Sequence, residues 1–91
     1  MDLSEIRKNI DQIDEQLVSL FCDRMYLSAQ VAAYKKANHM PIYVPARESE
    51  ILNNVAEQSG PEMGNYVQTL YETIFELSRN YQSIKNAEST Q

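Results

Sequence analysis

The sequence predicts an all-α fold of three helices, long, short and long, in a single small domain. A chain of 91 residues supports one domain at most. With two glycines and three prolines, it holds little material for the many turns of a β-rich fold. Apolar residues also recur at alternating steps of three and four in two long stretches, which is the spacing of an amphipathic helix.

The first of these stretches predicts a helix over residues 3–37. Its apolar positions form a heptad-like seam, namely Leu3, Ile6, Ile10, Ile13, Leu17 and Leu20. Asp2, followed three residues later by Glu5, resembles a capping pair at the start of the helix. Nothing breaks the helix before residues 38–41 (NHMP), so it is expected to end there.

The length of this helix predicts a homodimer. At roughly 1.5 Å per residue, residues 3–37 make a rod of about 52 Å. A compact domain of this size is only about 30 Å across. Because the rod overshoots its own domain, a second copy of the chain is expected to cover the excess. We therefore expect an intertwined helical homodimer, interlocked through the first helices.

Prolines and a glycine mark the boundaries of the other two helices. Pro41 and Pro45 bound a loop at residues 38–45, and Pro45 suits the first turn of a short helix that runs to about residue 59. The Gly-Pro pair at residues 60–61 combines a residue that favours a helix C-terminus with one that favours a helix start. A third helix is expected to follow.

Both of these helices have an apolar face. In the short helix it consists of Ile51, Leu52 and Val55. In the third helix the apolar residues again follow the alternating steps, at Met63, Val67, Leu70, Ile74, Leu77 and Tyr81. The residues from Lys85 onward are polar, so we expect a folded domain over residues 1–84 and a polar, disordered tail over residues 85–91.

The composition argues against several classes of function. The net charge of −5 does not suit sequence-independent binding of nucleic acid, which needs a basic surface. Cys22 and His39 are the only residues of their types, so one chain can form neither a disulfide nor a Cys/His zinc site, and no metal or cofactor is expected. No window approaches the roughly 18 apolar residues of a membrane span. The residues after Met1 do not form a secretion signal, and we expect a reduced, cytoplasmic protein.

An arginine in the core phase of the first helix predicts an anion site. The apolar seam continues with the same spacing, but position 24 holds Arg24, which is costly in a core unless it meets an anion. Ser28, Val31 and Lys35 lie along the same face. If two rods pack antiparallel, Arg7 of one chain can approach Arg24 of the other. Taken alone, such an arginine more often pairs with a carboxylate or extends to solvent.

Polar residues on the other helices extend this site. Arg47 and Glu48 open the second helix, and Ser78 and Gln82 lie one turn apart beside the third seam. Separately, these residues fit a surface ion pair and two boundary positions. Together with the first helix they predict a pocket with several cations, one carboxylate and two neutral hydrogen-bonding groups. Such a pocket suits a small dianion that carries a hydroxyl group.

Four segments of the chain resemble the helical chorismate mutases, including the mutase domains fused to prephenate dehydratase or prephenate dehydrogenase. The segments are IRKNIDQIDEQLVSLFCDRM, VAAYKK, PARESEIL and LYETIFELSRNYQ. The resemblance spans residues 3–83 without a gap, and seven functional positions of that family fall in order on three helices. It implies a homodimeric enzyme that rearranges chorismate to prephenate in phenylalanine and tyrosine biosynthesis.

The resemblance implies that four residues bind the two carboxylates of the substrate. Arg24 of one chain and Arg7 of the partner chain hold them directly, and Arg47 and Ser78 support this binding. Clamping both carboxylates holds the enolpyruvyl side chain over the ring in its reactive diaxial conformation, which is the orientation effect available to intramolecular reactions. Arg24 therefore belongs to the expected catalytic residues as well.

The other three residues are implied to act at the ether bond and the ring hydroxyl. Lys35 and Gln82 donate hydrogen bonds to the ether oxygen of the breaking C–O bond, where negative charge grows, and so favour the transition state. Glu48 accepts a hydrogen bond from the ring hydroxyl. The reaction is pericyclic and needs no nucleophile, metal or proton shuttle. Because the Gln82 amide does not titrate, activity is expected to vary little between about pH 6 and 8.

The resemblance also covers two valines, of which Val44 is left out of the implied site residues. Val31 is expected to belong to the apolar wall of the site. Many relatives carry a polar residue, often aspartate, where this chain has Val44, and the local backbone there contacts the hydroxyl. A main-chain contact survives the valine and a side-chain contact does not, so the departure affects the fine tuning of hydroxyl binding.

Two alternatives explain part of the same pattern. An isochorismate–pyruvate lyase shares the scaffold and the cationic pocket, but such lyases tend to lack a carboxylate directly after the arginine that corresponds to Arg47. A non-catalytic helical dimerisation module explains the heptads and the rod equally well, yet it explains neither Arg24 in core phase nor the polar pair Ser78 and Gln82. The sequence does not decide between a free-standing enzyme and one domain of a bifunctional chain.

Overall fold

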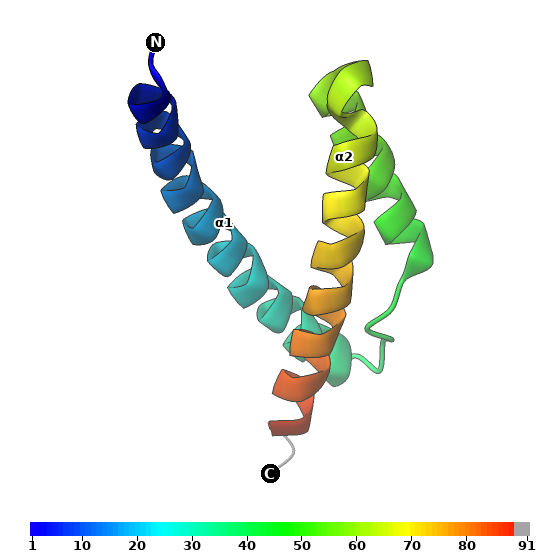
Figure 1. Cartoon of the computed structure of the whole chain (residues 1–91). Helices are drawn as coiled ribbons and strands as arrows, with labels where there is room; N and C mark the ends of the chain where they lie inside the picture. The colour runs from blue at the N-terminus through cyan, green and yellow to red at the C-terminus, as the bar shows by residue number, and fades with distance from the viewer. Residues whose placement is uncertain (89–91) are drawn as a thin grey trace.

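The computed structural model describes residues 1–88 and is all-helical. Helix α1 spans Leu3–Ala37, helix α2 spans Pro45–Glu88, and residues 38–44 connect them. The described residues contain no strand, so the predicted all-α class is confirmed. The N-terminal half of α1 leaves the molecule as a long arm, whereas its C-terminal half packs against α2 (Figure 1). Within residues 1–88, neither α1 nor α2 contains a stretch apolar enough to span a lipid bilayer.

The local sequence sets both ends of α1. At the start, Asp2 has an extended backbone, and its Oδ1 accepts a hydrogen bond from the backbone N–H of Glu5 at 2.9 Å. At the end, the backbone N–H of Met40 donates to the carbonyl of Lys35 at 2.8 Å, which satisfies one of the last helical acceptors. The predicted bounds of the first helix, residues 3–37, are confirmed.

The structure has two helices where the sequence predicts three. The expected second and third helices are joined within α2, whose backbone is non-helical at Gly60 (φ 83°, ψ 171°). Pro61 restarts the helix at once, so no loop separates the two parts. The chain reverses direction at this point (Figure 1), and Gln68 Nε2 donates to the carbonyl of Leu52 between the parts. We refer to them as the first segment (residues 45–59) and the second segment (residues 61–88) of α2.

Helix α2 also runs further than the sequence predicts. It continues through Glu88, four residues into the segment for which a disordered tail is expected. Lys85 Nζ pairs with Glu88 Oε2 at 3.2 Å in the last turn, and a lysine there also interacts favourably with the helix dipole. Residues 89–91, the rest of the expected tail, lie outside the described residues. The division into a domain and a tail stays a prediction.

The buried core of the chain is small and partly polar. Among the described residues its buried apolar side chains are Ala32 of α1, Val55 of the first segment and Phe75 of the second segment. The side chains of Ser78 and Gln82 are buried beside them. Because burying polar side chains is costly unless they find hydrogen-bond partners, two such residues in so small a core indicate a site rather than a packing element.

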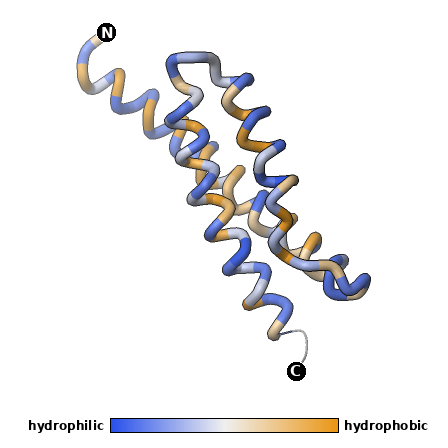
Figure 2. Tube along the Cα trace, turned by 90° about the vertical axis from the view of Figure 1, so that its right-hand side faces the viewer, coloured by the Kyte–Doolittle hydropathy of each residue, from blue (hydrophilic) through white to orange (hydrophobic). Residues whose placement is uncertain are grey.

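The apolar seam of α1 is exposed in the single chain. From Leu3 to Leu20 its residues keep between 41% and 64% of their surface accessible. Figure 2 shows hydrophobic residues recurring along this arm, and the molecule as a whole measures 53 × 29 × 14 Å. Monomeric proteins rarely expose a contiguous apolar face of this kind.

Candidate active site

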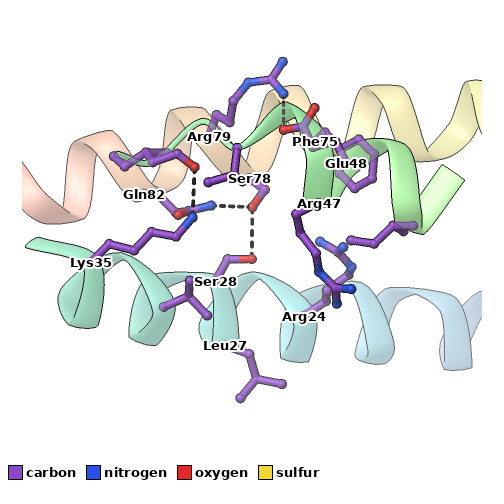
Figure 3. Close-up of a pocket in the computed structure, with 14 residues that line it drawn as sticks. Arg24, Leu27, Ser28, Lys35, Arg47, Glu48, Phe75, Ser78, Arg79 and Gln82 are labelled. Atoms are coloured by element: carbon purple, nitrogen blue, oxygen red, sulfur yellow. Dashed lines mark hydrogen bonds and ion pairs between the residues drawn. The ribbon is translucent and has the colours of Figure 1, made fainter. Parts of the chain in front are cut away.

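A cavity of about 320 Å³ lies where the C-terminal half of α1 faces α2 and the connecting loop. Side chains from α1, from the loop and from both segments of α2 form its wall (Figure 3). Four residues of the wall are cations and one is a carboxylate, although the whole chain has a net charge of −5. The cavity is therefore a local cationic site, and it suits an anionic ligand.

The structure brings together six of the seven predicted site residues in this wall. They are Arg24, Lys35, Arg47, Glu48, Ser78 and Gln82. Val31 and Val44 line the cavity as well. Arg7 of the same chain does not line it, because it lies near the N-terminal end of the α1 arm. The roles of these residues in binding and catalysis stay predictions.

Arg24 and Lys35 extend from one face of α1, about three turns apart. The guanidinium carbon of Arg24 lies 5.6 Å from the ring centre of Tyr71 and 5.8 Å from that of Phe75. Such cation–π contacts stabilise a half-buried guanidinium without neutralising its charge. Lys35 Nζ donates to the backbone carbonyl of Ile42 at 3.0 Å. Neither cation has a carboxylate partner within residues 1–88, so both charges are available to an anion.

Three polar side chains form a hydrogen-bonded chain between α1 and α2. Gln82 Nε2 donates to Ser78 Oγ at 2.9 Å, and Ser78 Oγ donates to Ser28 Oγ at 3.0 Å. Gln82 Oε1 is buried and has no hydrogen-bond partner in the described part of the chain. An unpaired buried acceptor costs about 1–3 kcal/mol. This amide therefore marks a place for a hydrogen-bonding ligand.

The orientation of the Gln82 amide bears on its predicted role. In this arrangement Gln82 Nε2 donates to Ser78, and Gln82 Oε1 is left without a hydrogen-bond partner among residues 1–88. A half-turn of the amide exchanges the two atoms, so that Ser78 donates to Oε1 and Nε2 becomes the open group. Ser28 can then donate to Ser78 in its turn. The predicted donation from Gln82 to an ether oxygen requires this second arrangement.

Arg47 lies at the exposed rim of the cavity. Its Nη1 is 2.6 Å from Glu50 Oε1, and the two side chains are 62% and 61% exposed. An ion pair so exposed contributes little to stability. Arg47 can therefore exchange Glu50 for an anionic ligand at low cost.

Glu48 is held by Arg79, a residue that the sequence alone does not single out. Arg79 Nη1 donates to Glu48 Oε2 at 2.5 Å, and the two side chains are 33% and 22% exposed. The guanidinium carbon of Arg79 also lies 4.9 Å from the ring centre of Tyr43 in the loop. The hydrogen bond to Glu48 raises the pKa of Arg79, so this side chain stays cationic throughout the physiological range.

Little in the sequence points to Arg79 beforehand. Its contact with Glu48 joins positions 31 residues apart, and only the reversal of α2 brings them together. Arg79 also lies beside the apolar seam of its helix, where a long cation is ordinarily solvated. The one available signal is its position directly after Ser78 and one turn before Gln82, among residues already predicted to belong to the site.

One protein family matches most of the chain. The family described as chorismate mutase type II matches residues 6–83. This range includes every residue of the cavity wall, from Arg24 to Gln82. It leaves out only the first five residues and the end of α2 with the residues that follow it.

Three curated relatives are similar to part of the chain. A bifunctional chorismate mutase/prephenate dehydratase of Aquifex aeolicus (strain VF5) is 39% identical over 54 residues, which are 59% of this chain and 15% of that protein. A T-protein of Haemophilus influenzae is 40% identical over 50 residues, 55% of this chain and 13% of that protein. A chorismate mutase of Methanocaldococcus jannaschii is 40% identical over 53 residues, 58% of this chain and 54% of that protein. The chain thus covers about half of the last relative and a small part of the other two.

Proposed function

The chain belongs to the chorismate mutase type II family, and on this basis we propose that it rearranges chorismate to prephenate. Relatives whose names include chorismate mutase support this activity. The observation that carries the proposal is the cavity of about 320 Å³, in which four cations and one carboxylate line one small volume. A substrate with two carboxylates and one hydroxyl group complements this wall.

Binding of the substrate carboxylates is the first task of the site. Arg24 is the natural ligand for one of them, because aromatic rings support its guanidinium and no carboxylate among residues 1–88 neutralises it. Arg47 and Ser78 support this binding from the two segments of α2. Fixing both carboxylates restrains the enolpyruvyl side chain over the ring, and such restraint lowers the barrier because the entropic cost of reaching the reactive geometry is met on binding.

Stabilisation of charge on the ether oxygen is the second task. In the rearrangement one C–O bond breaks and one C–C bond forms within the same molecule, and breaking runs ahead of forming. Lys35 and Gln82 donate hydrogen bonds to the oxygen as its negative charge grows. Removing one donor of this kind costs about 3 kcal/mol in the barrier. Glu48 accepts a hydrogen bond from the ring hydroxyl and so orients the substrate.

We propose that the active form is an intertwined homodimer in which Arg7 of each chain completes the site of the other. The exposed apolar seam of α1 supports this assembly, because a second chain can cover it. The position of Arg7 near the free end of the arm supports its action in a neighbouring chain rather than in its own. A cytoplasmic location stays a prediction.

Two alternatives account for less of the site. A lyase acting on isochorismate uses a similar cationic pocket, but the carboxylate of Glu48 in the wall favours the mutase. A dimerisation module without catalysis does not account for the unpaired buried oxygen of Gln82.

The proposal is tested by following the loss of chorismate absorbance with purified protein and identifying the product. We expect prephenate from the wild-type protein, and a fall in kcat of about a hundredfold in Lys35→Ala. Lys85→Ala is the matched control, because Lys85 pairs with Glu88 outside the cavity, and it should keep the wild-type rate. No turnover by well-folded wild-type protein overturns the mutase assignment. Isochorismate, with salicylate and pyruvate as products, is then the next substrate to try.

A further inference from the structure

We propose that Arg79 is a positioning residue that holds Glu48 in the cavity wall and acts on the substrate only through that carboxylate. The inference rests on the proposed function, in which Glu48 accepts a hydrogen bond from the ring hydroxyl. A glutamate side chain has three rotatable bonds, so a carboxylate at the edge of a cavity does not hold one position unaided. The contacts of Arg79 supply the missing restraint.

Arg79 engages one oxygen of the carboxylate and leaves the other open. Its Nη1 donates to Oε2 of Glu48, whereas Oε1 has no hydrogen bond within residues 1–88. Figure 3 shows Arg79 on the side of Glu48 that faces away from α1, opposite Ser28 and Arg24. Arg79 lines the cavity too, but its guanidinium lies on the side of the carboxylate that faces away from α1, and Oε1 can accept a hydrogen bond from a ligand hydroxyl.

Arg79 is itself fixed from a second direction. The ring of Tyr43 in the connecting loop lies 4.9 Å from its guanidinium carbon. A guanidinium is planar, so it can donate in its plane to Glu48 and stack its face on Tyr43 at the same time. Three parts of the chain, the loop and both segments of α2, thus meet at this one side chain. Such a second layer of contacts keeps a binding group in place before the ligand arrives.

The charge of Arg79 acts in the same direction. The substrate carries two negative charges, which repel the carboxylate of Glu48. The adjacent cation Arg79 reduces this repulsion. The two side chains are 33% and 22% exposed, so solvent and salt screen part of this effect. Placement of the carboxylate is therefore the larger contribution that we assign to Arg79.

A double-mutant cycle tests whether Arg79 acts through Glu48. The proteins are wild type, Arg79→Gln, Glu48→Gln and the double variant, and the readouts are kcat and KM for chorismate. We expect Arg79→Gln to lower kcat/KM about tenfold when Glu48 is present, and less than about twofold when Glu48 is already glutamine. Arg79→Lys keeps a charged donor and should restore part of the loss. Lys85→Gln removes an exposed cation from the same segment and should leave both constants unchanged.

Equal losses in the two backgrounds overturn the inference, because Arg79 then acts independently of Glu48, either on the substrate or on the fold. Thermal unfolding of the four proteins separates a general loss of stability from the kinetic coupling. If Arg79→Gln does not fold, the same cycle is run with Arg79→Lys, whose smaller loss should again vanish when Glu48 is glutamine. Absence of turnover by the wild-type protein is a distinct result, which removes the proposed function and the positioning role together.

Discussion

Among single residues, Arg24 separates the demands of function from those of folding. It occupies a core position of α1, yet its guanidinium meets two aromatic rings and no carboxylate among residues 1–88. Contacts of this kind contribute about 1 kcal/mol each. A methionine fills similar space and also packs well against aromatic rings. The fold therefore has little need of the charge at this position, whereas an anionic ligand needs it directly.

We accordingly expect the Arg24→Met variant to be about as stable as the wild-type protein but to have little activity. The free energy of unfolding, measured by urea denaturation at fixed protein concentration, should change by no more than about 1 kcal/mol. The value of kcat/KM for chorismate should fall at least about a hundredfold, because the guanidinium that binds a substrate carboxylate is gone. A loss of stability above about 2 kcal/mol would instead identify Arg24 as a structural residue.

The groups proposed to act on the ether oxygen predict a flat pH profile. The Gln82 amide does not titrate, and no histidine or cysteine lines the cavity. The hydrogen bond to Glu48 raises the pKa of Arg79. A group whose pKa is raised on folding stabilises the folded protein at lower pH, and this stabilisation is lost only as the pH rises through the raised pKa. For an arginine this pKa lies far above neutrality, so the contribution does not change between about pH 6 and 8. We expect kcat/KM to vary less than about twofold between pH 6 and 8.

The matching variant is Gln82→Glu. Its carboxyl group can donate a hydrogen bond only when protonated, so its activity should rise as pH falls. Rates measured across the same pH range in both proteins check this contrast. A steep rise toward acid in the wild-type protein would contradict the role assigned to Gln82.

How far single residues can be predicted depends on how local their placement is. Helical spacing puts Arg24 and Lys35 on one face of α1, so the sequence places them in one pocket. Arg79 meets Glu48 only because α2 folds back on itself, and no spacing rule contains that contact. The unpaired oxygen of Gln82 likewise depends on the positions of Ser78 and Ser28 in three dimensions.

Among the elements, α1 and α2 differ in how completely the sequence determines them. An N-terminal cap at Asp2 and the residues 38–41 after the apolar repeat define the two ends of α1. In α2 the Gly-Pro pair at residues 60–61 predicts the end of one helix and the start of another, but it does not show that a single non-helical residue completes the turn between them. The expected separation into a second and a third helix fails for this reason. The reversal depends on a backbone conformation that favours glycine.

The two glycines of α2 therefore predict opposite effects of alanine. Gly60, with φ 83° and ψ 171°, has a backbone conformation that residues with a Cβ atom avoid. Gly60→Ala should therefore destabilise the protein by about 1–3 kcal/mol through backbone strain. Steric overlap is not the cause, because the added Cβ meets no neighbouring atom within 4 Å. At Gly64 an added Cβ would lie 3.5 Å from the carbonyl oxygen of Ala56, an ordinary contact. Gly64→Ala should be neutral or stabilising by up to about 1 kcal/mol, because alanine favours the helix. Urea denaturation of both variants checks the contrast, and equal effects would contradict it.

At the scale of the whole molecule, the single chain has a larger accessible surface than a compact protein of the same mass. The chain exposes 7063 Å², whereas a compact monomer of 10.5 kDa exposes about 5400 Å². The excess of about 1600 Å² per chain is in the range that obligate dimers bury. The α1 seam contributes to this excess, which supports the proposed assembly through the arms.

The proposed sharing of sites predicts complementation between two impaired variants. Each site uses Arg24 of one chain and Arg7 of the other, so Arg7→Ala and Arg24→Ala should each be nearly inactive alone. In a heterodimer of the two, one site keeps both arginines and the other loses both. Refolding equal amounts together gives about half heterodimers, so about a quarter of all sites should be intact and about a quarter of the wild-type rate should return. The control mixture, Arg24→Ala with Lys35→Ala, damages two residues that the same chain contributes to one site, so no heterodimer regains an intact site and no activity should return. If the mixture of Arg7→Ala and Arg24→Ala regains no more activity than the control mixture, Arg7 lies outside the neighbouring site.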